Sequence, residues 1–224
     1  MSTQRIRVAV GASLLVLAGI GGVVFAAHPG PIGIDSSWLH FVAGHRNVHV
    51  TEFAKLITDV FSPVLMLLAA VVVGAVVAFL DRTLLRGVQI AGAAVAAFVI
   101  AEVLKVAVDR PRPPAAVQLA HHDSSASYTS GHVTGTTALI VVVLLVVVPW
   151  LPRLWADAAW VSGVVVIAAI MWSRTYLGMH WLTDTVGAVL VGTGSALVVT
   201  SAVESAPVDR WLRRSLSSPV RTVT

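Results

Sequence analysis

The feature that most constrains this chain is a series of apolar runs, each close to 20 residues long. A helix of about 20 residues crosses the roughly 30 Å hydrocarbon core of a bilayer. Stretches such as VVVGAVVAFL and LIVVVLLVVVPW are continuous, whereas the strands of a membrane barrel alternate apolar and polar residues. The runs are therefore predicted to be membrane-spanning helices. They cover residues 8–27, 61–80, 88–108, 133–151, 156–174 and 181–203.

The predicted architecture is an all-α bundle of six transmembrane helices that forms one domain, residues 1–224. Between the first two runs, WLHFVAG and FAKLITDVF have helical apolar spacing, which predicts short helices along the membrane interface. The first run follows Arg5 and Arg7 as a signal peptide would, but the bulky Phe25 occupies the third position before the candidate cleavage point. We therefore expect an uncleaved span. Residues 204–224 are predicted to be a basic cytoplasmic tail.

The distribution of positive charge predicts the orientation of the bundle. If the amino terminus is cytoplasmic, nine Lys and Arg residues lie on that side and six lie on the other. The inner ones are Arg5, Arg7, Arg82, Arg86, Arg153, Arg210, Arg213, Arg214 and Arg221, and the outer ones are Arg46, Lys55, Lys105, Arg110, Arg112 and Arg174. Cytoplasmic loops normally carry the excess of cations. We therefore expect a multi-pass plasma-membrane protein with both termini in the cytoplasm, and we interpret the net charge of +4 as topology rather than as a nucleic-acid partner.

Three polar clusters interrupt the apolar pattern, and each lies at the end of a predicted span. They are KVAVDRPRP at 105–113, YTSGH at 128–132 and SRTYLGMHWLTD at 173–184. In a bundle of alternating spans all three emerge on the same outer face, where water and lipid headgroups can reach charged groups. We therefore expect them to form one site.

The residue types in these clusters describe a site for phosphate. Arginine holds phosphoryl oxygens with paired hydrogen bonds, and lysine adds a compact charge. Backbone N–H groups at the start of a helix point toward anions, and glycine lets the backbone approach closely. The predicted phosphate ligands are Lys105, Arg112, Arg174, Ser130 and Gly131. Cysteine is absent from the chain, which excludes thiol catalysis and thiolate metal sites.

Two histidines and one aspartate are predicted to be catalytic. His180 and Asp184 are four residues apart, a spacing that would place them on one face of a helix. The carboxylate would then accept the proton of one ring nitrogen and leave the other nitrogen facing the phosphate. His180 is predicted to be the nucleophile that forms a phosphohistidine. His132 is predicted to be the acid that protonates the leaving group.

The clusters resemble the three signature motifs of the type 2 phosphatidic acid phosphatase family, integral-membrane lipid phosphate phosphatases related to the vanadium haloperoxidases. The matching residues are Lys105, Arg112 and Pro113, then Ser130, Gly131 and His132, then Ser173, Arg174, His180 and Asp184. Thr129 stands where the family usually has proline, and threonine can cap a helix.

The resemblance implies the same catalytic and phosphate-binding roles for these residues, with no metal and no cofactor. It implies hydrolysis of a phosphomonoester or diphosphate on a membrane lipid: phosphatidate, phosphatidylglycerophosphate or polyprenyl diphosphate. The expected partners are therefore this lipid phosphate and the bilayer, with no nucleic acid. The choice among the three lipids and the oligomeric state stay open.

The remaining charged residues and histidines near the outer face are expected to have structural rather than catalytic roles. The cations expected to be solvated at the interface are Arg46, Lys55 and Arg110. Glu102 precedes Lys105 by three residues and either pairs with it or faces the bundle. His121 and His122 are adjacent, which is a poor geometry for joint metal ligation, and are expected to lie on a solvated loop.

Two other functions are compatible with parts of the pattern. A non-enzymatic phospholipid-binding or transport protein could use the same basic pocket without the pair of His180 and Asp184. A rhomboid-like intramembrane serine protease would pair Ser130 with His180, but it has no use for three convergent cations. Release of phosphate in the presence of a chelator distinguishes the phosphatase from both.

Overall fold

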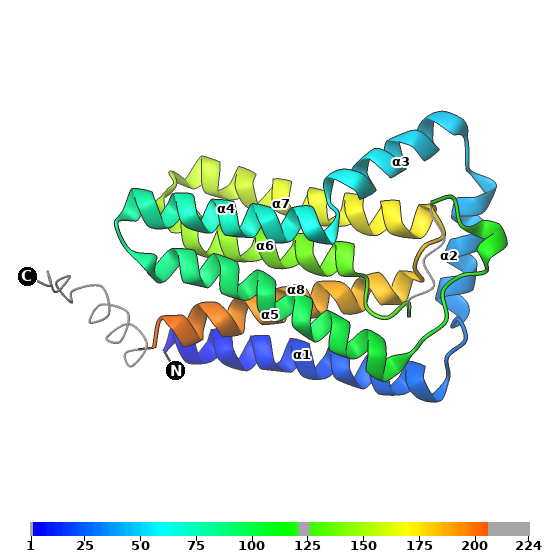
Figure 1. Cartoon of the computed structure of the whole chain (residues 1–224), viewed down its shortest axis with the longest axis horizontal. Coiled ribbons are helices and arrows are strands. Elements are labelled where there is room, and N and C mark those ends of the chain that lie inside the picture. The colour runs from blue at the N-terminus through cyan, green and yellow to red at the C-terminus, as the bar shows by residue number, and fades with distance from the viewer. Residues whose placement is uncertain (1, 121–125, 206–224) are drawn as a thin grey trace, which may run out of the picture.

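The structure is a computed structural model that describes residues 2–120 and 126–205, and its regular elements within these ranges are all helical. Six long helices run alongside one another (Figure 1). They are α1 Thr3–Ala27, α4 Pro63–Asp81, α5 Leu84–Val108, α6 Gly131–Val147, which continues into the 3₁₀ turn η2 Val148–Trp150, α7 Arg153–Tyr176 and α8 Leu182–Val203. All six are long and apolar enough to cross a membrane. The predicted six-helix architecture is confirmed.

The helix boundaries follow local capping signals. α1 begins at Thr3 rather than at residue 8, because the hydroxyl of Ser2 accepts a hydrogen bond from the backbone N–H of Arg5. α4 begins with Pro63 after the N-cap Ser62, an arrangement in which the missing proline N–H costs nothing. Arg82 adopts a left-handed conformation and ends α4, so that α5 starts almost at once and runs back along it.

The α6 and α8 helices form the centre of the bundle, and their apolar windows are the most buried of the six. α8 packs against α1, α5 and α6. Glycines permit these close approaches: a methyl group on Gly192 of α8 would lie 2.8 Å from the Thr134 carbonyl oxygen of α6. By contrast, α4 and α7 expose most of their surface to the surroundings, as expected for the outer helices of a membrane bundle.

Two shorter helices, α2 Gly33–Gly44 and α3 Val48–Val60, lie at one end of the bundle. Figure 1 shows α2 running across this end and α3 slanting away from it, opposite the end where α1 starts and α8 finishes. We call this the site end. The short helices predicted between the first two spans are therefore confirmed. The short 3₁₀ helix η1 Ala115–Val117 is part of the connection from α5 to α6.

The site end also collects the three polar clusters. α5 and α7 finish there and α6 and α8 begin there. The expectation that alternating spans bring the three clusters to one end of the bundle is therefore confirmed. Residues 121–125 and 206–224 lie outside the described residues. The interpretation of His121 and His122, and nearly all of the predicted basic tail, therefore fall outside the structure.

Candidate active site

The predicted site residues sit at four helix ends. Lys105 lies in the last turn of α5, and Arg174 lies in the last turn of α7. Ser130 is the N-cap of α6, and Asp184 is in the first turn of α8. The left-handed Asp109 stops α5 just before the Arg-Pro-Arg-Pro segment that carries Arg112. Groups distant along the chain are thus brought together because each one ends or begins a span.

His180 is buried, with 2% of its surface exposed, and both of its ring nitrogens have partners. Nδ1 lies 2.9 Å from the backbone oxygen of Ser127, and Nε2 lies 3.1 Å from Nη1 of Arg112. A neutral ring that carries its proton on Nδ1 satisfies both contacts, because it donates to the carbonyl and accepts from the guanidinium. Burial, followed by the charges of Arg112 and Arg174, lowers the pKa of His180 well below its usual value. The ring is therefore neutral near pH 7, with its Nε2 lone pair on the cationic side.

The direct pairing of His180 with Asp184 that the sequence predicts is not formed. α8 begins at Leu182, so His180 precedes the helix and does not share its face with Asp184. Nδ1 of His180 and Oδ2 of Asp184 are 3.8 Å apart. Instead, the Ser127 hydroxyl donates to Oδ2 of Asp184, while the Ser127 carbonyl accepts from the ring. Ser127 therefore connects the two residues.

The three predicted cationic ligands surround the same histidines. Lys105, Arg112 and Arg174 all act electrostatically on both His132 and His180. The Lys105 ammonium lies 3.6 Å from the position that a Cβ on Gly131 would occupy, and it donates to Glu102 at 2.7 Å. Of the two interpretations of Glu102, pairing with Lys105 is therefore the correct one.

The start of α6 completes this cationic pocket. Ser130 is the N-cap, but its side chain makes no capping hydrogen bond, and its buried Oγ has no hydrogen-bond partner among residues 2–120 and 126–205. A buried hydroxyl without a partner costs free energy, so one at a helix start next to Gly131, with the Lys105 ammonium nearby, indicates a place for an anion. Thr129 does not cap the helix: its hydroxyl lies 3.4 Å from that of Thr134.

Two of the cations expected to be solvated are instead engaged in the protein. Arg110 is fully buried and forms ion pairs with Asp35 at 2.7 Å and with Asp184 at 2.6 Å. Arg46 donates two hydrogen bonds to the backbone oxygen of Tyr176, at 2.6 and 3.1 Å. For Arg110 the expectation of solvation is wrong, because carboxylates from two distant segments pair with both of its terminal nitrogens. Arg46 is bonded to the protein but stays partly exposed. For Lys55 the expectation is right, since 40% of that side chain is exposed.

Three residues of the site were not found by sequence reasoning. Arg110 lies inside the first motif and Ser127 lies immediately before the second, so their positions were the available signals. Asp35 lies in α2, far from every motif, and no pattern in the sequence marks it.

Tyr128 supports the site without taking part in its chemistry. Its hydroxyl donates to the backbone oxygen of Ala18 at 2.6 Å, and its ring packs against Phe25 of α1. Burial, with the charge of Asp184, raises the pKa of Tyr128 to about 12. The phenol is therefore a neutral hydrogen-bond donor that ties the second motif to α1.

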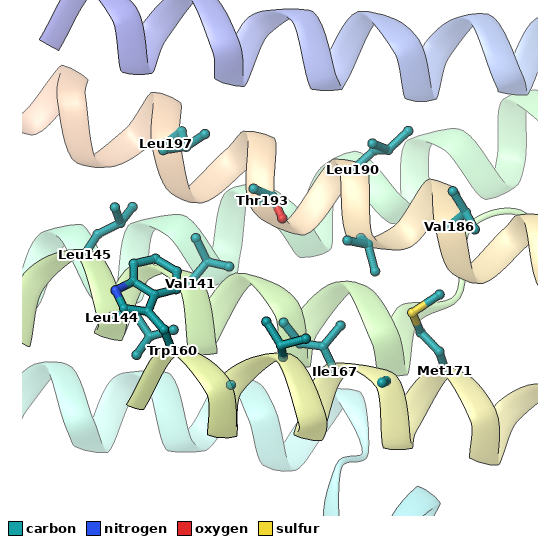
Figure 2. A pocket seen from close by; sticks show the side chains of 14 residues that line it. Val141, Leu144, Leu145, Trp160, Ile167, Met171, Val186, Leu190, Thr193 and Leu197 are labelled. Atoms are coloured by element: carbon teal, nitrogen blue, oxygen red, sulfur yellow. The ribbon is translucent and has the colours of Figure 1, made fainter. Parts of the chain in front are cut away.

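An apolar groove of about 500 Å³ runs between α6, α7 and α8, within the membrane-spanning part of the bundle. Figure 2 shows side chains of these helices, such as Val141, Ile167 and Leu190, around it. Its lining contains none of the predicted site residues, and Met171 and Val186 are the lining residues nearest to them along α7 and α8. The groove contributes no chemistry. Within the described part of the chain, no three His, Asp or Glu side chains gather as metal ligands would.

Fold and site together define a class: a helical membrane protein of six spans that surrounds two histidines with three cations at one end of its bundle. The family model of the PAP2 superfamily matches residues 86–206, more than half of the chain. The chain therefore belongs to the PAP2 superfamily.

Individual relatives are more distant. The chain is 34% identical over 107 residues to the "Putative undecaprenyl-diphosphatase YbjG" of Escherichia coli (strain K12), a match that covers 45% of this chain and 50% of the relative. It is 25% identical over 142 residues to an undecaprenyl-diphosphatase of Sulfolobus acidocaldarius, covering 62% of this chain and 65% of the relative. The matches thus span about half to two thirds of these relatives' lengths.

One solved structure shares the fold along almost the whole chain. It is the crystal structure of a transmembrane PAP2 type phosphatidylglycerolphosphate phosphatase from Bacillus subtilis, with a TM-score of 0.69 and 24% identity. The superposition covers 89% of this chain and 98% of that one.

Proposed function

We propose that this protein is a phosphatase that hydrolyses the phosphomonoester or diphosphate headgroup of a membrane lipid. The observation that carries the proposal is the placement of His180: a buried neutral ring with Nε2 3.1 Å from Arg112, inside a group of cations that face both histidines. Three cations around a neutral nucleophile suit a substrate that brings two or more negative charges.

The first step transfers the phosphoryl group to the protein. Nε2 of His180 attacks phosphorus and the bond from phosphorus to the lipid-side oxygen breaks. His132, which takes up a proton when the anionic substrate offsets the surrounding cations, gives that proton to the leaving oxygen. The proton stays on Nδ1 and remains hydrogen-bonded to the Ser127 carbonyl, so the positive charge that develops on the ring is stabilised without a proton transfer. Lys105, Arg112 and Arg174 stabilise the equatorial oxygens.

The second step returns the enzyme to its starting state. A water molecule attacks phosphorus, His132 takes the proton of the water, and the N–P bond breaks to release inorganic phosphate. His132 therefore acts first as an acid and then as a base, which lets one residue serve both steps.

A polyprenyl diphosphate is the first candidate substrate. Both relatives found by sequence carry the name undecaprenyl-diphosphatase, and the solved structure with the same fold is a phosphatidylglycerolphosphate phosphatase. A phosphatidylglycerophosphate and a phosphatidate belong in the same panel because each presents a terminal phosphomonoester in its headgroup.

The decisive experiment measures phosphate release from these three lipids in detergent with a chelator present. We expect His180→Ala to abolish turnover while phosphate binding persists, and Asp184→Asn to lower kcat more than it raises KM. His49→Ala is the matched control: this exposed histidine lies at the same end of the bundle, and its loss leaves the rate unchanged. Full phosphate release by the His180→Ala protein would defeat the mechanism.

The geometry favours the phosphatase over the serine protease. Such a protease needs a hydrogen bond between its serine and its histidine, whereas Oγ of Ser130 has no partner in the described part of the chain and Nε2 of His180 faces Arg112. Binding of phosphate or lipid without any release of phosphate would support the transport protein instead.

The proposed orientation places the site end outside the cell and both termini in the cytoplasm. It is supported by the engagement of the outer cations: Arg110 and Arg174 are buried, Lys105 pairs with Glu102, and Arg46 donates to the backbone oxygen of Tyr176. Roles in binding or structure thus explain why the outer face carries six Lys and Arg residues. Because the chain lacks cysteine, Val48→Cys at the site end and Arg153→Cys at the opposite end test it in whole cells. We expect an impermeant maleimide to label only Val48→Cys; the reverse pattern would invert the topology.

A further inference from the structure

The fully buried Arg110 has no role in the proposed reaction, yet its side chain forms ion pairs with two buried carboxylates near the site. We propose that Arg110, held by Asp35, is a positioning residue that fixes the proton of His180 on Nδ1 by acting through Asp184 and Ser127. This inference rests on the proposed function and names residues that the family motifs do not assign.

Arg110 holds both groups that meet Nδ1 of His180. Its side chain donates from Nη1 to Oδ1 of Asp184 at 2.6 Å. Its backbone oxygen accepts the N–H of Ser127 at 2.7 Å. Ser127 in turn accepts the Nδ1 proton at 2.9 Å and donates its hydroxyl to Oδ2 of Asp184. One residue therefore positions the acceptor of the ring proton and the carboxylate behind that acceptor.

Asp35 supplies the second anchor, from a helix distant in sequence. Nη2 of Arg110 donates to Oδ2 of Asp35 at 2.7 Å. Oδ1 of Asp35 accepts the backbone N–H of Thr183 at 2.9 Å, which is the second residue of α8 and an otherwise unsatisfied donor of that helix end. α2 is thereby fastened to the start of α8, one residue before Asp184.

The surroundings of Arg110 exclude a role in phosphate binding. Both terminal nitrogens are bonded to carboxylates, and the Phe25 ring of α1 lies 3.8 Å from the guanidinium carbon. The side chain is 0% exposed. With no exposed surface the guanidinium is out of reach of a substrate, so Arg110 can act only through the groups that it holds.

The electrostatic arrangement explains why this matters for the reaction. Arg110 sits between two buried carboxylates and offsets the desolvation of Asp184, and a carboxylate left unpaired in such a place is strongly unfavourable. If Asp184 loses its ion pair with Arg110, it no longer fixes the Ser127 hydroxyl, and the Ser127 carbonyl is no longer held beside Nδ1 of His180. The ring is then free to carry its proton on Nε2, where it cannot attack phosphorus.

The kinetic test compares Arg110→Met, Arg110→Lys and Asp35→Asn in detergent, each checked for helical content and for a cooperative thermal transition. We expect Arg110→Met to lower kcat by about 10- to 100-fold, as the loss of a group that orients a functional histidine does, with KM unchanged. Arg110→Lys keeps the charge and restores part of the rate. A raised KM with an unchanged kcat in Arg110→Met would overturn the proposal, because that result would make Arg110 a substrate ligand.

A double-mutant cycle separates positioning from general stabilisation. If Arg110 acts through Asp184, then Arg110→Met costs little further rate in the Asp184→Asn background. Arg46→Met is the control, since Arg46 is a partly buried arginine at the site end that contacts the Tyr176 carbonyl instead of Asp184. Its effect adds to that of Asp184→Asn. Equal additivity of the two arginine variants would refute the positioning role.

A measurement on the ring itself keeps this inference apart from the proposed function. In protein labelled with ¹⁵N-histidine, His180 signals, assigned by their loss in His180→Gln, show a neutral ring protonated on Nδ1, and Arg110→Met shifts the ring toward the other tautomer. Unchanged signals in the variant defeat the inference even if lipids are hydrolysed. If no lipid phosphate is hydrolysed but the signals respond, the proposed function fails and the positioning role of Arg110 stands.

Discussion

Replacing Ser130 by alanine is expected to stabilise the free protein and to weaken its hold on phosphate. The Ser130 hydroxyl is buried and unpaired within the described residues. An unpaired buried polar group costs about 1–3 kcal/mol, so we expect its removal to raise the free energy of unfolding by about 1 kcal/mol. For a chain of 150–250 residues that corresponds to a rise of about 2–4 °C in Tm.

The same substitution removes one donor from the proposed anion site. A hydrogen bond to a charged acceptor contributes about 1.5–3 kcal/mol, which corresponds to about 10- to 150-fold in affinity. Because ligand binding raises Tm in proportion to the logarithm of ligand over Kd, thermal unfolding at increasing inorganic phosphate measures both effects. The Ser130→Ala protein should start from a higher Tm and need correspondingly more phosphate for the same rise.

Ser195→Ala provides the matched control. The Ser195 hydroxyl is also buried without a partner in the described residues, but it lies in the middle of α8. Its removal should raise Tm by a similar amount and leave the dependence on phosphate unchanged. The reasoning is refuted if both variants respond to phosphate like the wild type, or if Ser130→Ala lowers the Tm of the free protein.

Three further predictions concern packing, pH and substrate affinity. A methyl group on Gly187 would lie 2.6 Å from Cε2 of Tyr128, so Gly187→Ala should lower the free energy of unfolding by about 1–3 kcal/mol and lower Tm. Gly19→Ala is the control, because a methyl group there would have nothing within 4 Å and should leave Tm unchanged. Equal Tm values for the two variants would contradict this prediction. Burial and the charge of Arg112 hold the pKa of His180 in the folded protein below its ordinary value. Above about pH 6.5 the ring is neutral in the folded and the unfolded chain, so His180 adds no pH dependence to stability. Below about pH 6.5 the unfolded chain takes up the proton first, and the free energy of unfolding falls. Wild-type Tm should therefore drop more than that of His180→Gln between about pH 7 and pH 5, and parallel curves would disprove the assignment. Arg112→Lys loses the planar fork that reaches Nε2 and should raise KM for the lipid by about tenfold or more; an unchanged KM in the phosphate-release assay would remove Arg112 from the ligands.

Parts of the site were predictable because they depend on local or periodic properties of the chain. The number of spans follows from the length of apolar runs, and the shared face of Lys105, His132 and Arg174 follows from counting spans between them. Neither of these requires knowledge of which helices touch.

The contacts of single atoms were not predictable in the same way. The spacing of His180 and Asp184 predicted a shared helical face, but α8 starts two residues after His180 and the pairing runs through Ser127 instead. Helix boundaries shift by one turn at small cost, and a shift of one turn decides whether two side chains meet.

The amino-acid sequence by itself determined that this chain is a six-span helical bundle with a cationic, histidine-bearing site at one end, because hydrophobic length and motif order are written along the chain. Only the tertiary structure decided that Arg110 is buried between Asp35 and Asp184 rather than solvated. Asp35 and Arg110 are 75 residues apart, and a charge is stable out of water only where folding brings its partners to it.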